Sequence, residues 1–354
     1  MLDIKLIREN TEKIKKSALD KGVEIDTNHI LEIDAKYREL SMKVQELREQ
    51  RNNNSSAIKG KPTDEQLEEG KRLKIELDRE ENALKAVEEE LNEWLLKIPN
   101  PAKDDVKFGK NDTENDVIKT VGEPTKFNFT PKDHLEIGQL LDIIDVVRAA
   151  KVSGARFYYL KNEGALLEFA LLQFALDTLM PEGFVPVIPP VLIKTEMMRK
   201  LGYMENGGEE DMFHLREDGL TLVGTAEHAL VSMHADEVLD SKKLPIRYLG
   251  YSPSFRREAG SYGKDTKGIL RVHQFDKVEM VSFVEKGKDD EEHEYLLSLE
   301  EKLFDALKIP YQVVKMCTGD LGFPAARKFD IEAWMPYQDK YREVTSVSTV
   351  TDFQ

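Results

Sequence analysis

Two runs of regularly spaced apolar residues constrain the fold of this 354-residue chain more than any other feature. The first run covers residues 30–47 and the second covers residues 73–98, both with alternating steps of three and four. This spacing places one apolar stripe along each helix and is typical of a coiled-coil seam. The seam positions are Ile30, Ile33, Tyr37, Leu40, Val44 and Leu47, then Leu73, Leu77, Glu80, Leu84, Val87, Leu91, Trp94 and Ile98.

A polar segment separates the two runs. Residues 52–56 are Asn and Ser, and Gly60 and Pro62 follow, which favours a turn at this point. Two helices joined by a short turn pack side by side, so the sequence predicts a long antiparallel helical hairpin over about 27–98. The alternative for such a hairpin is a purely structural or dimerising coiled coil.

The segments on either side of the hairpin suggest the domain boundaries. Residues 1–25 predict a short helical segment before the hairpin, and Pro99 and Pro101 stop the second helix. We therefore expect an N-terminal helical domain at 1–105 and a second domain at 106–354. The expected core contacts of the first segment are Ile4, Ile7, Ile14 and Leu19.

The second domain mixes helical and strand-like patterns, which predicts an α+β fold with an antiparallel sheet flanked by helices. No GxxxxGK[ST] or GxGxxG sequence opens a helix after a strand, so neither a P-loop nor a Rossmann domain is indicated. The expected helices are 135–151, 166–180 and 291–307. The expected strands are 184–188, 246–251, 268–284 and 311–316.

Composition favours a soluble cytoplasmic protein with no membrane segment. Charged residues make up 33% of the chain and hydrophobic residues 40%, and no apolar run is long enough for a membrane span. The single cysteine, Cys317, excludes an internal disulfide. The seven histidines lack the paired spacing of a structural zinc site.

The net charge of −16 disfavours non-specific binding to nucleic acid, because phosphate contacts supply most of such affinity. The turn of the hairpin is locally basic, however, since residues 47–61 contain four cations and only one acid, Glu49. This turn is the best candidate for an RNA contact. Its cations are Arg48, Arg51, Lys59 and Lys61.

Residues 255–279, FRREAGSYGKDTKGILRVHQFDKVE, predict two strands around a Gly-rich loop. Side chains alternate between the faces of a strand, so one sheet surface would gather two arginines, two carboxylates and an aromatic ring. Such a surface suits a nucleoside triphosphate beside a small zwitterion. The alternative is an exposed hairpin with cross-strand ion pairs. The set is Arg256 and Glu258 on the first strand, and Arg271, Phe275 and Glu279 on the second.

The same segment closely resembles motif 2 of the class II aminoacyl-tRNA synthetases, in the form found in seryl-tRNA synthetases. The start of the chain, MLDIKLIREN, is also similar to that family, and the resemblance stays in register from Met1 to Gln354. The chain is therefore identified as a member of this family. The other similar segments are residues 134–171 at the start of the catalytic domain, 183–192 (motif 1), 222–230 (serine binding) and 343–354 (an ATP-contacting strand).

The resemblance implies an ATP-dependent serine–tRNA ligase. Such an enzyme joins serine to AMP and then transfers the seryl group to tRNA(Ser), and to tRNA(Sec) where that tRNA is present. ATP and Mg²⁺ are the implied cofactors. A cytoplasmic homodimer formed through motif 1 is implied as well, with the hairpin and its basic turn reaching the tRNA. Neither chemical step needs a covalent enzyme intermediate, so catalysis is expected to come from positioning and charge stabilisation.

The resemblance also assigns the ATP site. Arg256 would bridge the α-phosphate and the serine carboxylate, and Arg271 would hold the distal phosphates. Glu258 would accept from the adenine amino group while Phe275 stacks on the base. Arg256 and Arg271 are thus the expected catalytic residues. The further ATP contacts are Arg257, Val272, Val344 and Thr345.

Glu343 and Ser346 are implied as contacts to the triphosphate and its Mg²⁺. In a regular strand, residues three apart lie on opposite faces. The pairing of Glu343 with Ser346 therefore rests on the resemblance, and a β-bulge between them would reconcile it with the strand geometry.

The serine site is implied to lie around the Thr225–Ala226–Glu227 segment, with Arg256 and Ser348. Glu279 would read the hydroxyl or ammonium group of serine. The alternative for the Thr-Ala-Glu sequence is ordinary helix capping. The alternative for Glu279 is a strand carboxylate paired with Lys277 or Lys315.

The sequence departs from the family in two places. Thr345, Val347 and Thr349 stand where relatives commonly carry Ser, Cys and Asn. The sequence also stops at Gln354, where the family continues into motif 3, and we expect a chain without that motif to be poorly soluble and nearly inactive. Two alternatives follow: a non-catalytic tRNA-binding or regulatory protein of the same fold, and a coiled-coil scaffold with a vestigial nucleotide domain.

Overall fold

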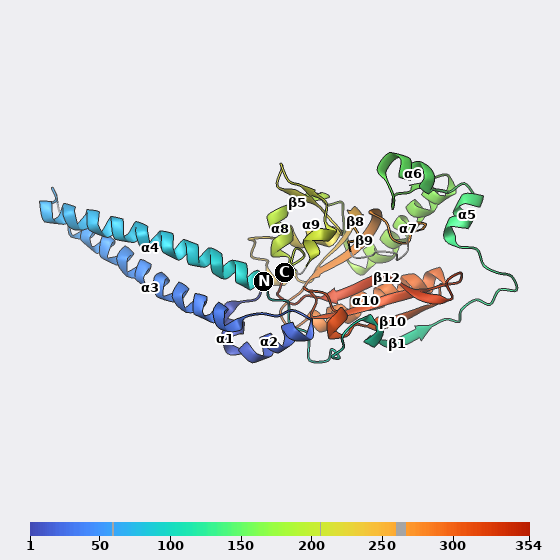
Figure 1. Cartoon of the computed structure of the whole chain (residues 1–354), viewed down its shortest axis with the longest axis horizontal. Helices are drawn as coiled ribbons and strands as arrows, with labels where there is room; N and C mark the ends of the chain where they lie inside the picture. The colour runs from blue at the N-terminus through green and yellow to red at the C-terminus, as the bar shows by residue number, and fades with distance from the viewer. Residues whose placement is uncertain (59, 206, 260–266) are drawn as a thin grey trace. The chain divides into compact units, whose positions relative to one another are not determined.

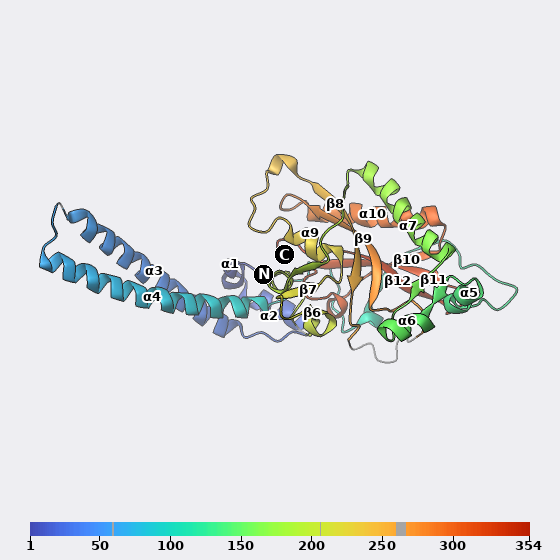
Figure 2. The same ribbon diagram turned by 90° about the horizontal axis from the view of Figure 1, so that it is seen from above.

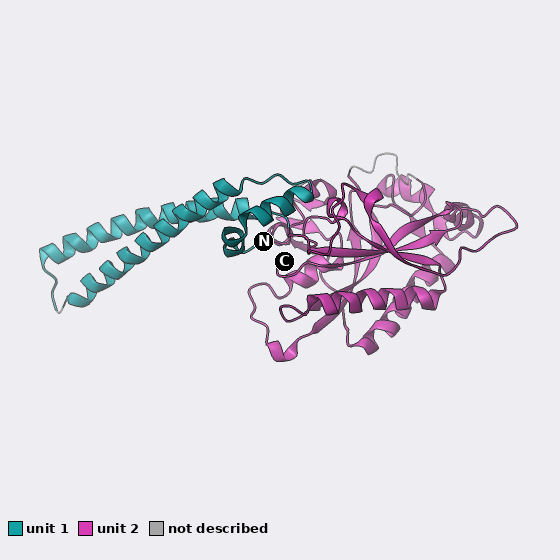
Figure 3. Ribbon diagram, turned by 90° about the horizontal axis from the view of Figure 1, so that it is seen from below, with its two compact units in different colours: residues 1–99 teal, residues 100–354 magenta. Residues whose placement is uncertain are grey.

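The computed structural model describes residues 1–354 except for 59, 206 and 260–266. The chain forms two compact units, Met1–Pro99 and Asn100–Gln354 (Figure 3). The sequence suggested a boundary between residues 105 and 106, a few residues further along. The first unit is entirely helical in its described elements, whereas the second mixes helices and strands, as the α+β prediction requires.

The first unit consists of two short helices followed by a long hairpin. Helices α1 (Ile4–Glu9) and α2 (Thr11–Asp20) precede α3 (Thr27–Ala57) and α4 (Asp64–Leu96). Figures 1 and 2 both show α3 and α4 running side by side along their length. The helical hairpin predicted from the heptad runs is therefore confirmed.

Specific capping contacts fix where the two hairpin helices begin. The Asp26 carboxylate accepts from the His29 amide at the start of α3. Thr63 and Gln66 form a reciprocal capping box at the start of α4. Each contact satisfies an amide that the first helical turn would leave without a partner.

Every predicted seam residue of the hairpin is buried or half-buried. Glu80 is the one charged seam residue. It is 7% exposed, and its carboxylate accepts from Lys43 at 3.0 Å and from Arg79 at 2.6 Å. One core prediction for this unit is wrong, because Leu19 is 60% exposed while the neighbouring Ala18 is buried.

The second unit is built on two main sheets. The first has the order β1-β10-β11-β12 with all pairs antiparallel, and the second has the order β4-β8-β9, with β4 parallel to β8. The first sheet comprises β1 (Asp116–Val121), β10 (Tyr311–Lys315), β11 (Arg327–Met335) and β12 (Lys340–Thr349). The second comprises β4 (Val185–Val187), β8 (Ile246–Phe255) and β9 (Gln274–Phe283).

Two small sheets and six α-helices are the other main elements in the described part of the second unit. The small sheets pair β2 (Ile144–Asp145) with β3 (Tyr159–Leu160), and β7 (Leu220–Leu222) with both β5 (Leu192–Lys194) and β6 (His214–Leu215). The helices are α5 (His134–Leu140), α6 (Val146–Ser153), α7 (Glu163–Leu179), α8 (Thr195–Lys200), α9 (Ala226–Ser232) and α10 (Asp289–Leu307).

Helix α10 packs on one face of the larger sheet, as Figures 1 and 2 show. Apolar residues of α10 and the end of α7 meet inward-facing residues of β10, β11 and β12 in one core cluster. Burial of such side chains is the main stabilising contribution to a domain of this kind. The cluster includes Leu179, Leu296, Leu299, Phe304, Tyr311, Ile331 and Val347.

The sequence pattern merged two helices that the structure separates. Residues 135–151 predicted one helix, but the chain turns after α5, with Asp142 at a φ of 56°, and pairs as β2 before α6 starts. The Asp145 carboxylate accepts from the Arg148 amide and so begins the new helix. An apolar period alone cannot reveal a capping residue that restarts a helix in the middle of an amphipathic run.

Helix α7 carries an unusual amount of exposed apolar surface. Among the residues that the structure describes, Glu163–Glu182 is the one segment whose length and composition would allow a membrane span. Leu166, Leu167 and Phe169 are 66%, 59% and 65% exposed. We call these three residues the α7 patch, because exposed apolar side chains that gather on one helix can mark an interaction site.

Candidate active site

A cavity of about 560 Å³ in the second unit brings together most of the residues that the sequence suggested for ATP and serine. Its walls come from the start of α9, the turn after β8, and strands β9 and β12. In the described sheets, β9 and β12 are edge strands. The predicted site residues that line this active-site cavity are Thr225, Glu227, Arg256, Phe275, Glu343, Val344, Thr345, Ser346 and Ser348.

Arg256 is held in the cavity by contacts to both its backbone and its side chain. It directly follows the last residue of β8, and its amide donates to the His273 carbonyl at 3.1 Å. Its Nε donates to the Gly224 carbonyl at 3.1 Å, and its guanidinium carbon lies 5.2 Å from the centre of the Phe275 ring. The guanidinium is therefore oriented before any ligand arrives.

Of the five residues that strand alternation predicted on one sheet face, three lie outside the strands. Strand β8 ends at Phe255 and β9 begins at Gln274, so Arg256, Glu258 and Arg271 lie outside both strands. Glu258 adopts a φ of 55°, and its carboxylate accepts from the Arg271 guanidinium in an ion pair. These two side chains meet through that ion pair instead of through a shared strand face.

Several predicted contacts do not belong to the described lining of the active-site cavity, the Glu258–Arg271 pair among them. Arg257 donates to the Met212 carbonyl at 2.7 Å. Ala226 is fully buried in a core cluster with Leu230 and Val281, and Val272 is also buried. These placements leave backbone groups as the only contacts that Ala226 and Val272 could offer a ligand.

Thr225 serves both as a helix cap and as part of the candidate serine site. Its hydroxyl accepts from the Glu227 amide at 3.3 Å and donates to the Glu279 carboxylate at 2.5 Å. Lys277 forms an ion pair with Glu279, and its ammonium lies 3.1 Å from the Thr225 hydroxyl. Of the two partners considered for Glu279, Lys277 is therefore the one observed, whereas Lys315 pairs with Asp105.

Lys277 is a site residue without a predicted role. Its position two residues after Phe275 and two before Glu279 on β9 puts all three side chains on one face. Strand alternation failed for Arg271, but it correctly places Lys277 on the face shared by Phe275 and Glu279.

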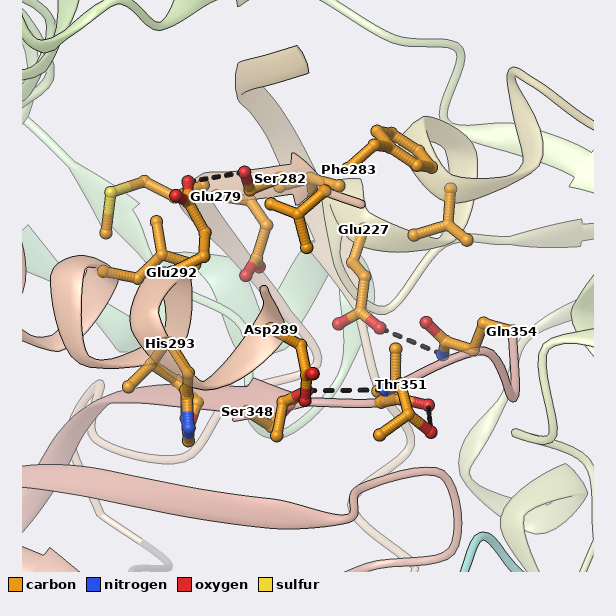
Figure 4. A pocket seen from close by; sticks show the side chains of 18 of the residues that line it. Glu227, Glu279, Ser282, Phe283, Asp289, Glu292, His293, Ser348, Thr351 and Gln354 are labelled. Carbon is orange, nitrogen blue, oxygen red and sulfur yellow. Dashed lines mark hydrogen bonds between the residues drawn. The ribbon is translucent and has the colours of Figure 1, made fainter. Parts of the chain in front are cut away.

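Glu227 is half-buried, and its carboxylate accepts hydrogen bonds from two side chains of the described part of the chain. The Tyr203 hydroxyl donates to it at 2.6 Å. The Gln354 amide donates to it at 3.1 Å, as Figure 4 shows. Burial raises the pKa of Glu227, and the nearby Glu279 carboxylate adds to this effect. Two carboxylates this close favour a cation between them, such as a ligand ammonium group. Tyr203 was not predicted as a site residue, because no motif in the sequence includes it.

Figure 4 shows a second cavity of about 330 Å³. Glu227, Ser348 and Gln354 form part of its lining, and so does Glu279 on β9. A third cavity of about 290 Å³ is lined by apolar residues of α7 and α10 together with β9 and β12. In that cavity the buried Glu300 carboxyl accepts from Thr345 at 3.0 Å, and burial raises the pKa of Glu300 to about 8.

Strand β12 contains a β-bulge of the kind that reconciles Glu343 with Ser346. Glu332 pairs with Glu343 and Ile331 pairs with Thr345, so Val344 is the extra residue on β12. Glu343, Ser346 and Ser348 are exposed, while Val347 and Thr349 are buried on the other face. The bulge therefore allows Glu343 and Ser346 to share the cavity side of the strand.

Acidic groups gather beside Glu343. Asp330 lies directly opposite Ser346 in the β11–β12 register and is 4% exposed. Its Oδ1 lies 3.1 Å from the Lys328 ammonium but has no well-aligned hydrogen bond within the described part of the chain. Burial raises the pKa of Asp330 to about 7 despite the nearby Lys328. The described residues contain no cluster of three or more His, Cys, Asp or Glu side chains arranged to hold a metal.

The basic turn of the hairpin is only partly available for a ligand. Arg48 forms an ion pair with Glu81 at 2.7 Å, whereas Arg51 and Lys61 are exposed. Lys59 lies outside the described residues.

Comparison with known proteins identifies both units. Residues 1–102 match the model of the seryl-tRNA synthetase N-terminal domain, and residues 212–354 match that of the tRNA synthetase class II core domain (G, H, P, S and T). The serine–tRNA ligase of Dictyoglomus turgidum is 44% identical, with 100% of this chain and 85% of the relative covered.

Solved structures show similarity to the same family. A crystal structure of seryl-tRNA synthetase from Pyrococcus horikoshii complexed with ATP superposes with a TM-score of 0.89 at 39% identity, covering 100% of this chain and 85% of that one. The crystal structure of the cytoplasmic serine–tRNA ligase of Naegleria fowleri in complex with AMP superposes with a TM-score of 0.83 at 28% identity. The match covers 100% of this chain and 84% of that one.

Proposed function

The chain belongs to the seryl-tRNA synthetases, and on that premise we propose how its active-site cavity activates serine. The protein is an ATP-dependent serine–tRNA ligase of the class II aminoacyl-tRNA synthetases. The observation that carries the proposal is the meeting of Arg256, Phe275 and Glu227 in one cavity. The alternatives of a non-catalytic tRNA-binding protein or a scaffold have no support among the relatives.

In the proposed first step, a carboxylate oxygen of serine attacks the α-phosphorus of ATP. A new O–P bond forms, the bond to the β-phosphate bridging oxygen breaks, and pyrophosphate leaves with that electron pair. Arg256 stabilises the negative charge on the α-phosphate oxygens and orients the serine carboxylate. Its fixed guanidinium supports this role, because a preorganised donor needs no rearrangement as charge develops.

Phe275 stacks on adenine in this proposal, with Glu258 and Arg271 at the nucleotide edge of the site. Glu258 and Arg271 form an ion pair with each other in the structure. This pair must separate when ATP binds, so that Arg271 can reach the distal phosphates and Glu258 can reach the adenine amino group. The remaining nucleotide contacts proposed are Arg257, Val272, Val344 and Thr345, the first two through their backbone or after a side-chain movement.

Serine is proposed to bind beside Thr225, Glu227 and Glu279. The two carboxylates provide the negative charge that an ammonium group needs, and Glu279 can also accept from the serine hydroxyl. Lys277 pairs with Glu279 in the structure, so its ammonium has to move aside for the ligand ammonium. Ser348 and the Ala226 backbone complete the proposed serine contacts.

The residues on β12 fit a Mg²⁺ ion that accompanies ATP. Glu343 and Ser346 offer oxygen donors on one exposed face, and the Asp330 oxygen without an aligned hydrogen bond lies beside them. Mg²⁺ prefers such oxygen ligands together with water and phosphate. When bound, the ion would neutralise phosphate charge, and Glu343 and Ser346 are the residues proposed to hold it.

In the second step, the 3′-terminal ribose hydroxyl of tRNA attacks the acyl carbon of seryl-adenylate and AMP leaves. We propose that tRNA(Ser), and tRNA(Sec) where present, contacts the hairpin turn through Arg48, Arg51, Lys59 and Lys61. The local positive charge of this turn supports the role, because the chain as a whole is acidic. A cytoplasmic location is proposed from the same family membership.

We also propose a homodimer formed through motif 1. The exposed α7 patch supports it, and so does Ile188 of motif 1, which is 83% exposed. Replacing Phe169 with Asp should shift the mass measured by light scattering from dimer to monomer. The matched control is Asp at Ile75 in the hairpin, which is 71% exposed and should leave the mass unchanged. A dimeric Phe169→Asp variant would exclude the α7 patch from the interface.

Serine-dependent ATP–pyrophosphate exchange tests the proposed function directly. It is measured with residues 1–354 alone and with a motif 3 segment of a relative appended, because the family resemblance places further contacts in that motif. The form with the higher exchange is called the assay form. Exchange that requires serine is the expected result, and the absence of serine-dependent exchange in both forms would refute the proposal.

A further inference from the structure

His228 lies in the wall of the active-site cavity, yet the proposed reaction gives it no role. It belongs to the first turn of α9 and is 5% exposed. Its ring packs against Tyr203 with the ring centres 4.4 Å apart. A polar side chain this deeply buried normally makes a specific hydrogen bond.

The hydrogen bond that His228 makes leads to Arg256. The Gly224 amide donates to His228 Nδ1 at 3.2 Å, and the Gly224 carbonyl accepts from Arg256 Nε at 3.1 Å. A Cβ atom built on Gly224 would lie 3.5 Å from His228 and 3.6 Å from Arg256, so both side chains pack on the same residue.

The Gly224 backbone must be held in place if its carbonyl is to orient the Arg256 side chain. Its amide and its carbonyl belong to adjacent peptide units, and glycine between them rotates more freely than any other residue. The first unit is held on both sides, because the Gly224 amide donates to His228 and the Val223 carbonyl accepts from the Phe255 amide at 2.9 Å. With this unit held, rotation about one backbone bond of Gly224 is what still directs the carbonyl that Arg256 uses.

The His228 ring can accept a hydrogen bond throughout the working pH range. Burial, together with the charges of Arg256 and Lys277, lowers the pKa of His228 to about 3. The ring is therefore neutral at working pH. Because Nδ1 accepts from the Gly224 amide, the ring proton is assigned to Nε2.

We propose that His228 is a positioning residue that fixes the Arg256 guanidinium through Gly224. The proposal rests on the role in adenylate formation proposed above for Arg256. Simple packing or capping does not account for the contact, because Thr225 already caps α9 by accepting from the Glu227 amide. Loss of the Nδ1 acceptor would leave the Gly224 amide without its partner and let the carbonyl turn away from Arg256.

A matched pair of substitutions separates the hydrogen bond from the packing. In His228→Asn, the side-chain oxygen takes the place of Nδ1 as an acceptor. His228→Leu has nearly the same size and no acceptor. In the assay form, single-turnover seryl-adenylate formation should slow about tenfold in His228→Leu, and His228→Asn should recover most of the rate. Neither variant should change the pH profile between pH 6 and 9, because the wild-type ring is neutral throughout.

A double-mutant cycle tests the coupling to Arg256. In the Arg256→Ala background, His228→Leu should cost nothing further, because the side chain it positions is already gone. Equal rates for the Leu and Asn variants, or fully additive losses with Arg256→Ala, would overturn the proposal. Matching melting temperatures for the Leu and Asn variants exclude unfolding as the cause of a difference.

A binding measurement keeps this proposal separate from the proposed function. Calorimetric ATP affinity should fall in Arg256→Ala, fall less in His228→Leu, and stay near wild type in His228→Asn. This order is expected whether or not serine-dependent exchange is observed. An affinity that is reduced equally by Leu and Asn would contradict the positioning role even if exchange is robust.

Discussion

The helical hairpin and the active-site cavity obtain their geometry from different kinds of information. In the hairpin, the local repeat of α3 and α4 decides which side chains are buried, and all the predicted seam residues follow it. In the cavity, Thr225, Arg256 and Glu343 come from three separate turns or strands and meet only through long-range contacts. We therefore expect single substitutions in the hairpin to have little effect on serine activation, and single substitutions in the cavity to have a large one.

The largest effect is expected at Arg256. Arg256→Ala should slow seryl-adenylate formation in the assay form by about 100- to 1000-fold, the scale for loss of one preorganised donor. Arg256→Lys should recover little, because an ammonium group lacks the guanidinium fork. Single-turnover kinetics measure both variants. Arg51→Ala in the hairpin is the control and should leave adenylate formation unchanged, whereas a rate within a few-fold of wild type in Arg256→Ala would remove this residue from catalysis.

Shortening the hairpin should separate tRNA charging from serine activation. Lys43 contacts Glu80 and Asn54 contacts Gln66, so removing residues 46–76 and closing the chain with a Gly-rich turn keeps the helix register. Charging of tRNA(Ser) should fall by about 100-fold as phosphate contacts are lost, while pyrophosphate exchange persists.

Charge substitutions at the turn sharpen the same test. Replacing Arg51 and Lys61 with Gln should weaken tRNA binding and reduce the slope of log affinity against log salt by about one to two units. Normal charging by the shortened protein would show that the hairpin is only structural. A parallel loss of exchange and charging would indicate a folding defect.

Glu279 should control the preference for serine over alanine. A site that hydrogen-bonds a substrate hydroxyl strongly rejects an analogue without it. Glu279→Ala should therefore reduce the ratio of kcat/KM for serine to that for alanine by about 50-fold. Threonine discrimination should change less, since it depends on space. An unchanged ratio would mean that another residue reads the hydroxyl.

Glu300 should make the stability of the second unit depend on pH. Burial raises the pKa of Glu300 from 4.5 to about 8, so the folded protein keeps a proton that the unfolded chain releases. The contribution of Glu300 to the free energy of unfolding is largest below pH 4.5. This contribution is lost as the pH rises toward 8. Glu300→Gln should remove this loss and stabilise the protein at pH 8 by about 2 kcal/mol, with little change at pH 4.5.

Denaturant unfolding at the two pH values measures this difference. In the hairpin, Glu81→Gln serves as the control, because the Arg48–Glu81 pair is exposed and should contribute little at either pH. A Glu300→Gln variant that is equally destabilised at both pH values would show that the carboxyl group is ionised in the folded protein.

The sequence predicted the hairpin better than the site because the hairpin depends on local periodicity. The heptad positions require only an apolar stripe, and the caps at Asp26 and Thr63 follow ordinary preferences. Strand alternation succeeded for Phe275 and Glu279, which lie within β9, and failed for Arg271, which precedes it. Where a strand ends is decided by tertiary packing, and a two-residue period carries no information about it.

The bulge in β12 resolves a conflict that the sequence left open. Alternation put Glu343 and Ser346 on opposite faces, whereas the resemblance gave them a shared role that a bulge would reconcile. The structure has the extra residue at Val344. By contrast, Tyr203 and His228 reach the site through side-chain contacts that no spacing in the sequence encodes.

The measurement that tests the account most directly is serine-dependent ATP–pyrophosphate exchange in the assay form, with the hairpin intact and with residues 46–76 removed. The account predicts that exchange requires serine, survives the shortened hairpin within a few-fold, and falls by about 100-fold or more in Arg256→Ala. Exchange that does not need serine, or that disappears with the hairpin while the second unit stays folded, would contradict it.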